Sequence, residues 1–202
     1  MAVKVAREAT GAIAFFAALA AVTSAAVGGG WAADADQAVF ERVRASRTQS
    51  GVVVARAVSA LAEPAVAYPL LAAVGVCAAR RAGWQHAVWP SLTVASGAIV
   101  RRRLSLAIAR PRPPQWAWLA EPEGFSLPSK HTSLAALAAG ACVRATGTDC
   151  ASAQAVPLLV AVGVGASRVY LGVHWPGDVI AGWLFAEGWL RLTGALNVPA
   201  VR

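Results

Sequence analysis

Residues 167–178 read SRVYLGVHWPGD, and they place an arginine, a histidine and a carboxylate directly before an apolar segment. Arg168 has a permanently charged, planar guanidinium that suits two phosphate oxygens at once, and His174 can attack phosphorus as a neutral imidazole. If a helix begins near Pro176, Asp178 comes close enough to hold one ring nitrogen of His174. The stretch therefore predicts a helix start with a nucleophilic histidine beside it. The alternative for this stretch alone is a capping and hydrogen-bonding pair without chemistry.

The composition is that of an integral membrane protein. Of the 202 residues, 57% are hydrophobic and only 14% are charged, which is too apolar for an ordinary soluble domain. The formal net charge is +8, but the arginines are scattered between apolar segments without interleaved aromatic residues. This pattern argues against nucleic acid as a partner. The expected partners are the bilayer and a phosphorylated lipid, and the oligomeric state stays open.

Apolar segments recur along the chain at lengths that suit a bilayer. The first follows Lys4 and Arg7, as in a signal peptide, but its length of about 20 residues favours a retained helix. Its removal is the alternative. Residues 34–50 form a polar connector, and the start of the next apolar region, before Pro64, suits an amphipathic surface helix. We therefore predict an all-α fold, a six-helix transmembrane bundle in one domain over residues 1–202, with segments at about 11–33, 64–79, 86–103, 131–147, 153–170 and 177–194.

The order of the connectors predicts the orientation. With a cytoplasmic N-terminus, Lys4, Arg7, Arg80 and Arg144 lie inside, as the positive-inside tendency requires. The outer side nevertheless holds a second group of cations, and binding of an anion is the natural reason for it. This group consists of Arg101, Arg102, Arg103, Arg110, Arg112, Lys130 and Arg168.

A second motif spans residues 103–111, which read RLSLAIARP. Arg103 and Arg110 are seven residues apart, which is two helical turns and therefore one helix face. Both guanidiniums can then point into one pocket. The alternative is that each arginine merely extends to the lipid headgroups.

A third motif, PSKHT at residues 128–132, stands directly before an apolar segment. Ser129 is the predicted N-cap, so free backbone amides and the positive end of a helix would face an anion. His131 is placed to donate a proton to a leaving oxygen. An ordinary cap with an interfacial histidine is the competing interpretation.

Together, the three motifs resemble the type 2 phosphatidic acid phosphatase superfamily. That family has Lys-x6-Arg-Pro, Pro-Ser-Gly-His and Ser-Arg-x5-His-x3-Asp in this order, and the last of these, at residues 167–178, matches here without change. Arg103 replaces the family lysine and keeps its charge, while Lys130 replaces the glycine. Lys130 can reach over the anion and add a charge, or it can point to the lipid headgroups.

The resemblance implies a metal-independent phosphatase that needs no cofactor and works in two steps. His174 would attack phosphorus to form a phosphohistidine, which water then hydrolyses. His131 would protonate the leaving group and afterwards activate water, while Asp178 orients His174. The phosphoryl oxygens would be held by Arg103, Arg110, Ser129, Lys130 and Arg168.

The resemblance also implies an active site on the extracytoplasmic face of a bacterial plasma membrane. Candidate substrates are polyprenyl pyrophosphate, phosphatidylglycerol phosphate, phosphatidic acid and a polyprenyl phosphosugar, and the sequence does not choose among them. Two alternatives remain open: a lipid phosphotransferase that uses the same phosphohistidine, and a non-catalytic membrane protein that binds lipid in the basic pocket.

Overall fold

The structure is a computed structural model that describes residues 2–147 and 150–196, a part of the chain that contains helices and loops but no strand. The predicted all-α fold is confirmed. The elements in these residues are α1 (Ala2–Gly28), α2 (Trp31–Ala45), α3 (Gln49–Ala60), α4 (Pro64–Ala82), α5 (Gln85–Ile108), the short 3-10 helix η1 (Gln115–Ala117), α6 (Lys130–Thr146), α7 (Ala151–Tyr170) and α8 (Pro176–Leu196).

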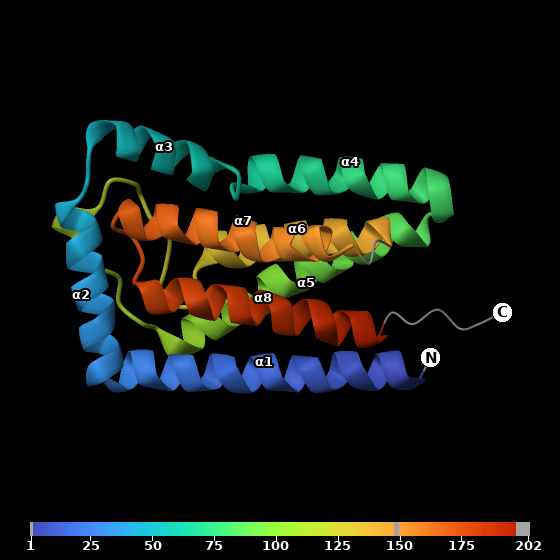
Figure 1. Cartoon of the computed structure of the whole chain (residues 1–202), viewed down its shortest axis with the longest axis horizontal. Helices are drawn as coiled ribbons and strands as arrows, with labels where there is room; N and C mark the ends of the chain where they lie inside the picture. The colour runs from blue at the N-terminus through green and yellow to red at the C-terminus, as the bar shows by residue number, and fades with distance from the viewer. Residues whose placement is uncertain (1, 148–149, 197–202) are drawn as a thin grey trace.

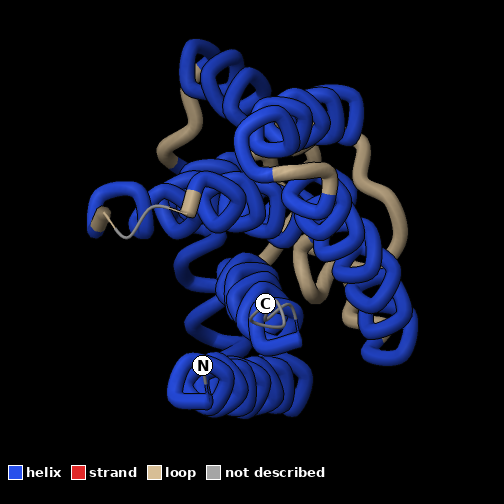
Figure 2. Tube along the Cα trace, turned by 90° about the vertical axis from the view of Figure 1, so that its right-hand side faces the viewer, coloured by secondary structure: helices blue, strands red, loops and turns tan. Residues whose placement is uncertain are grey.

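The long helices lie side by side, and α2 crosses one end of the bundle (Figure 1). Helix α8 packs against α1 and α6, and α6 also contacts α5 and α7. A view from the opposite end of the bundle looks along the long helices, with the start of α1 toward the viewer (Figure 2). The two ends of the bundle are therefore built differently, and α2 distinguishes one from the other.

Small residues allow the three C-terminal helices to approach closely. A side-chain carbon at Gly140 of α6 would collide with Leu190 of α8, and one at Gly165 of α7 would collide with Val179 of α8. Close approach at small residues is the usual way in which membrane helices pack. It holds together the ends of α6, α7 and α8, which carry two of the three sequence motifs.

The first helix ends earlier than the sequence predicts. It stops at Gly28, because Gly29 and Gly30 have φ angles of 80° and 73°, which favour glycine and break a helix. The polar segment that was expected as a connector is itself helical, since α2 occupies Trp31–Ala45. Helix α2 has one buried face with Asp36 and Phe40, and Phe40 packs on Trp175 at a ring-centroid distance of 5.2 Å. The connector thus becomes a structural cover over the end of the bundle.

Two helices are long and apolar enough to cross a membrane, among the residues that the structure describes. These are α1, with mean hydropathy 1.9, and α7, with mean hydropathy 1.3, while α3 and residues Pro64–Cys77 of α4 would form one further span bent by 46°. Large apolar side chains also face outward from the bundle, including Ile13, Leu70, Ile99, Leu159 and Val162. An apolar outer surface of this extent suits contact with lipid.

Candidate active site

His174 lies in the turn between α7 and α8 and is almost fully buried, with a relative exposure of 1%. Its Nδ1 is 3.3 Å from Oδ2 of Asp178, the pair that the sequence predicts. The same carboxylate oxygen accepts the backbone N–H of Trp175 at 2.9 Å. Helix α8 begins at Pro176, so Asp178 lies in its first turn. The spacing of four positions from His174 to Asp178 therefore brings the carboxylate to the imidazole, as predicted.

Arg112 defines which nitrogen of His174 carries the proton. Its Nη1 lies 3.0 Å from Nε2 of His174. An arginine has only donors, so Nε2 must be the acceptor and the ring proton sits on Nδ1, facing Asp178. Nε2 is therefore the unprotonated nitrogen, as a nitrogen nucleophile needs, and its lone pair faces Arg112 at the pocket that both residues line.

Burial keeps this imidazole neutral. It lowers the pKa of His174 to about 4, and the hydrogen bond and negative charge of Asp178 offset only part of that effect. Burial also lowers the pKa of Arg112, to about 10, so its guanidinium stays charged near neutral pH. The pair at neutral pH is thus a neutral histidine beside a cation.

Arg110 supports Asp178 and does not face the pocket. Its Nη1 donates to Oδ1 of Asp178 and its Nη2 to Oδ2 of Asp36, both at 2.6 Å. Asp36 in turn accepts the backbone N–H of Gly177 at 2.7 Å. Helix α2 is thereby tied through two buried ion pairs to the carboxylate that holds His174.

The predicted placement of Arg103 and Arg110 in one pocket is wrong. Helix α5 ends at Ile108 and Ala109 adopts a left-handed conformation with φ 51°, so the two-turn spacing does not continue to Arg110. Arg103 is left on the exposed surface of α5. Two helical turns would have aligned the guanidiniums only if the helix had run on through residue 110.

Arg112 takes the pocket position that was assigned to those arginines. Its guanidinium also donates to the carbonyl oxygens of Glu123, Gly124, Phe125 and Val173 at 2.6 to 2.9 Å. The sequence contained a signal for it, because residues 110–113 read RPRP and offer two Arg-Pro pairs. Seven residues before Arg112 stands Ser105, which is not basic, so the family spacing of a basic residue and Arg-Pro matches Arg103 and Arg110 only.

The PSKHT motif begins α6. Ser129 is its N-cap, and the Ser129 hydroxyl accepts the N–H of Thr132 as expected. That hydroxyl is fully buried and also bonded to the Thr132 hydroxyl at 3.0 Å, so it does not line the pocket. Lys130 and His131 occupy the first helical turn, where backbone N–H groups lack partners within the helix.

His131 and Lys130 each contact a carboxylate that the sequence analysis did not select. Nε2 of His131 lies 2.8 Å from Oε1 of Glu63, and Nζ of Lys130 lies 2.8 Å from Oε2 of Glu123. No motif pointed to Glu63, which stands far away in sequence at the start of α4. The loop of residues 109–129 supplies Glu123, and its contact with Lys130 spans the entrance side of the site.

Arg168 reaches the pocket from the last turn of α7. It is buried, and its Nη1 donates to Oγ of Ser59 at 2.8 Å. Its Nε is buried without a hydrogen-bond partner among the described residues. An unsatisfied buried donor on a cation is expected where an anion binds.

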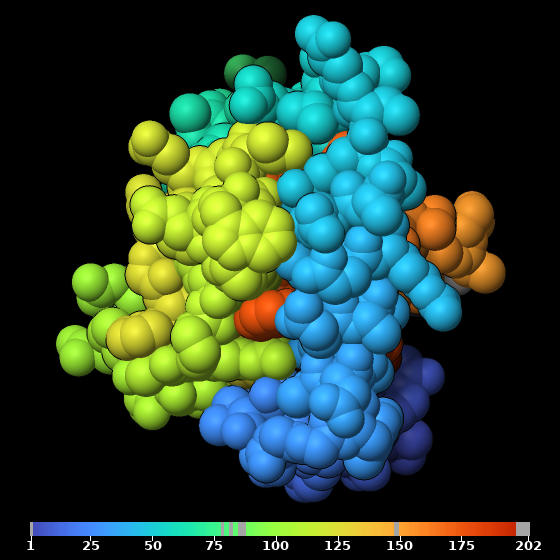
Figure 3. Space-filling view, turned by 90° about the vertical axis from the view of Figure 1, so that its left-hand side faces the viewer, coloured from blue at the N-terminus to red at the C-terminus, as the bar shows by residue number. Residues whose placement is uncertain are grey.

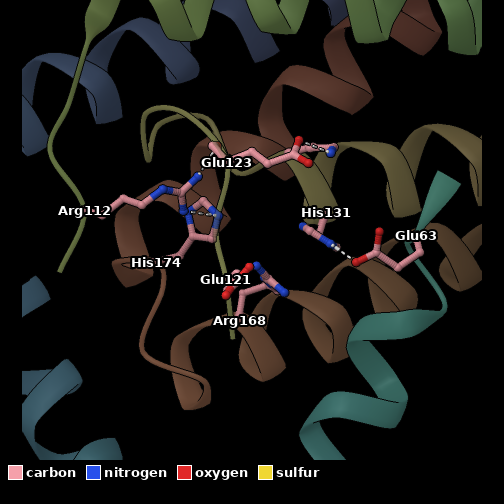
Figure 4. Close-up of a pocket in the computed structure, with 8 residues that line it drawn as sticks. Glu63, Arg112, Glu121, Glu123, His131, Arg168 and His174 are labelled. Carbon is pink, nitrogen blue, oxygen red and sulfur yellow. Dashed lines mark hydrogen bonds and ion pairs between the residues drawn. The ribbon is translucent and has the colours of Figure 1, made fainter. Parts of the chain in front are cut away.

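These side chains converge on one small pocket that is partly open to solvent. Figure 4 shows His174 and Arg112 on one side, His131 and Glu63 on the other, and Arg168 between them. The pocket is lined by Glu63, Arg112, Glu121, Glu123, Lys130, His131, Arg168 and His174. At this end of the bundle, α2 and loop 109–129 cover most of the surface, and a small orange-red part of the segment near residue 175 shows between them (Figure 3).

A helical bundle with two histidines and two arginines around one pocket, and an aspartate behind one histidine, has the groups that phosphoryl transfer requires. A model of the PAP2 superfamily matches residues 86–198, more than half of the chain. The chain therefore belongs to the PAP2 superfamily, and the resemblance drawn from the motifs is confirmed.

A curated relative matches a shorter part of the chain. The undecaprenyl-diphosphatase of Sulfolobus acidocaldarius is 40% identical over 67 residues, which cover 33% of this chain and 31% of the relative. The chain thus matches about a third of that relative's length.

Two solved structures share the fold. A transmembrane PAP2 type phosphatidylglycerolphosphate phosphatase from Bacillus subtilis has a TM-score of 0.82 and 22% identity, covering 93% of this chain and 96% of that one. LpxE of Aquifex aeolicus has a TM-score of 0.64 and 21% identity, covering 78% and 93% respectively. The first similarity extends beyond the family match to include α1 and α2.

Proposed function

We propose that this protein is a lipid phosphatase that hydrolyses a phosphate or diphosphate monoester through a phosphohistidine on His174. The observation that carries the proposal is the orientation of His174: Nδ1 faces Asp178, and Nε2 faces the pocket with Arg112 at 3.0 Å. Membership in the PAP2 superfamily supports the same reaction class. So do two of the similar proteins, which are named as a diphosphatase and a phosphatase.

In the first step, Nε2 of His174 forms a bond to phosphorus while the bond from phosphorus to the lipid oxygen breaks. His131 gives its proton to that leaving oxygen. Arg112 and Arg168 hold the other phosphoryl oxygens as negative charge develops, together with the amides of the first turn of α6. Arg112 already lies against Nε2, so a phosphoryl group that it binds is delivered to the nucleophile.

In the second step, water attacks the phosphohistidine and inorganic phosphate leaves. His131, now neutral, takes a proton from the attacking water. The bond from Nε2 to phosphorus breaks, and the imidazole returns to its neutral form with its proton still on Nδ1, facing Asp178. Two arginines supply the charge neutralisation that metal ions supply in other phosphoryl-transfer enzymes.

The bundle suits a membrane orientation with the pocket at the extracytoplasmic surface and the N-terminus in the cytoplasm. Six helices, α1 and α4 to α8, would cross the bilayer, and α2 and α3 would lie at the outer surface. A pocket at that surface can take a phosphorylated headgroup while the lipid tails stay in the bilayer. A polyprenyl diphosphate and phosphatidylglycerol phosphate are the first substrates to test, because similar proteins bear those names.

Two alternatives remain from the sequence analysis. A phosphotransferase would share the first step and pass the phosphoryl group to a second lipid in place of water. A non-catalytic lipid-binding protein would have no use for a buried, neutral and oriented His174. The geometry favours chemistry over binding alone.

The deciding experiment incubates the purified protein with a panel of lipid phosphates in the presence of a chelator and measures inorganic phosphate. We expect release from at least one lipid, and transfer to an added lipid alcohol would identify the phosphotransferase. Absence of both products with every lipid contradicts the proposal.

A paired substitution tests the assignment of the arginines. Arg112→Ala should lower turnover by about 10²- to 10³-fold, the usual effect of removing one transition-state donor. Arg103→Ala, on the exposed face of α5, should change it less than threefold, roughly the limit for a surface charge. The reverse order of effects would restore the motif assignment made from the sequence.

A further inference from the structure

Glu63 is a pocket residue whose role no sequence motif assigns. It stands at the junction where α3 and α4 meet at a bend of 46°. Its Oε1 lies 2.8 Å from Nε2 of His131, and Figure 4 shows the imidazole between Glu63 and the side of the pocket that holds Arg168 and His174. One ring nitrogen is therefore bound to Glu63, and the other lies away from it.

The Glu63 side chain contacts His131 and does not cap its own helix, α4. It is the N-cap residue of α4, yet its side chain makes no capping hydrogen bond, and Pro64 follows at the first helical position. Glutamate is not among the favoured N-cap residues. The carboxylate thus makes no hydrogen bond to the first turn of α4 and contacts His131.

The backbone around Glu63 is well fixed. Its N–H donates to the carbonyl of Ala60 at 3.1 Å, and its own carbonyl accepts the N–H of Ala67 at 2.8 Å. The same junction holds Arg168 through Ser59. A carboxylate on a fixed junction can hold an imidazole in one orientation, whereas one on a mobile loop could not.

The Glu63 side chain is also half exposed, with a relative exposure of 49%, whereas that of His131 is 10% exposed. A carboxylate in contact with both water and the ring can stabilise the proton on His131 and exchange it with solvent. Burial of the ring acts in the opposite sense, and so do the neighbouring cations Arg168 and Lys130, since each disfavours a positive charge on the ring. Glu63 is the carboxylate that directly balances them.

We infer that Glu63 is the positioning residue of the acid histidine, corresponding to Asp178 for the nucleophile. It orients the His131 ring and favours its protonated form for the first chemical step. The inference rests on the proposed phosphatase function. Glu63 touches neither the phosphoryl group nor the leaving oxygen in this account, and it acts through His131.

The test compares two substrates with matched tails. One is an alkyl phosphate, whose alkoxide must be protonated as it leaves, and the other is a nitrophenyl phosphate with the same alkyl chain, whose phenolate leaves without a proton. We expect Glu63→Ala to lower kcat on the alkyl phosphate by about 10- to 100-fold, part of the full effect of a general acid. On the nitrophenyl phosphate, turnover should stay within about threefold of the unmodified protein, because no general acid is required there.

Glu63→Gln keeps the shape and the acceptor oxygen but removes the charge. It should show the same selectivity for the leaving group with a smaller loss, about tenfold on the alkyl phosphate. The matched control is Glu41→Gln, a change in an exposed carboxylate of α2 that contacts Arg44 and Gln37 and lies outside the pocket. It should leave both activities unchanged.

Retained nitrophenyl phosphatase activity in the Glu63 variants also reports that they are folded. Equal losses on both substrates, or no loss on the alkyl phosphate, would overturn the role of Glu63. If the unmodified protein turns over neither substrate nor any lipid phosphate, the proposed function itself fails, and the inference fails with it.

Discussion

The two histidines of the pocket have opposite surroundings. His174 is 1% exposed, and Asp178, Arg110 and Asp36 form a buried chain behind it that reaches from α8 to α2. His131 meets the half-exposed Glu63, and the neighbouring Lys130 pairs with Glu123 near the surface. The proposed nucleophile is thus held in place by buried side chains, whereas the proposed acid lies beside a half-exposed carboxylate.

The difference agrees with the proposed roles of the two histidines. A nucleophile benefits from a single tautomer and orientation, and burial provides both. An acid that later serves as a base must exchange protons, and water must reach it in the second step. We therefore expect substitutions behind His174 to affect both catalysis and stability, and substitutions near His131 to act mainly on catalysis.

The largest expected effect comes from Asp178→Asn. It leaves the shape of the site nearly intact, but an amide can stabilise the wrong tautomer of His174 and weakens the bond to Arg110. Turnover should fall by about 10⁴-fold, as for the aspartate of a serine-protease triad. Steady-state kinetics on the best lipid phosphate would check this, and a loss below about tenfold would mean that His174 does not depend on that carboxylate.

The next effect concerns stability at the buried end of the same chain. Asp36→Ala removes one partner of Arg110 and should lower the free energy of unfolding by about 3 kcal/mol, the cost of breaking a buried ion pair. Asp34→Ala is the matched control, because Asp34 is exposed in the first turn of the same helix and should cost less than about 1 kcal/mol. Unfolding in detergent, followed by circular dichroism, would compare them, and equal effects would show that the ion pair does not stabilise the fold.

The third prediction uses the depressed pKa of His174, about 4 in the folded protein against about 6.5 when unfolded. Between these values the unfolded chain binds a proton that the folded protein does not, so stability falls as the pH drops from about 6.5 to about 4. His174→Gln should remove this part of the pH dependence. Melting temperatures of the two proteins across that range would test it, and parallel curves would indicate an imidazole that titrates normally.

The smallest effect is expected on the open side. Lys130→Gly restores the family glycine and breaks the surface contact with Glu123, so KM should change only by about two- to fivefold, as for a partly exposed ion pair. Glu123→Gln should have a similar effect, because it breaks the same contact from the other partner. A change in kcat of more than about tenfold in Lys130→Gly would place this lysine among the groups that stabilise the transition state.

The sequence predicted the all-helical fold and the local geometry of two motifs, because both depend on short spacings. The contact between His174 and Asp178 could be predicted because the two residues are four positions apart at the start of a helix. Ser129 could be predicted as an N-cap because it stands directly before an apolar segment. The assignment of Arg103 and Arg110 failed because it required a helix to continue where Ala109 ends it. The pattern of apolar residues does not indicate that α5 ends at Ile108.

Residues that meet only in the folded bundle could not be found in this way. Asp36 joins Arg110 across 74 positions, and Glu63 joins His131 across 68 positions. Both come from polar segments that read as connectors or interruptions in the sequence. Their roles depend on α2 and the α3–α4 junction folding back over one end of the bundle.

The central claim is that the phosphoryl group passes through His174, and the most direct measurement is to trap it there. Protein with the His131→Ala substitution, which should slow the attack of water, would be mixed with an activated aryl phosphate that needs no acid to react, quenched in alkali, and mapped by mass spectrometry. The account predicts an acid-labile phosphohistidine on the peptide that contains His174, absent from His174→Ala. Turnover without that adduct, or a phosphoryl group on another residue, would contradict it.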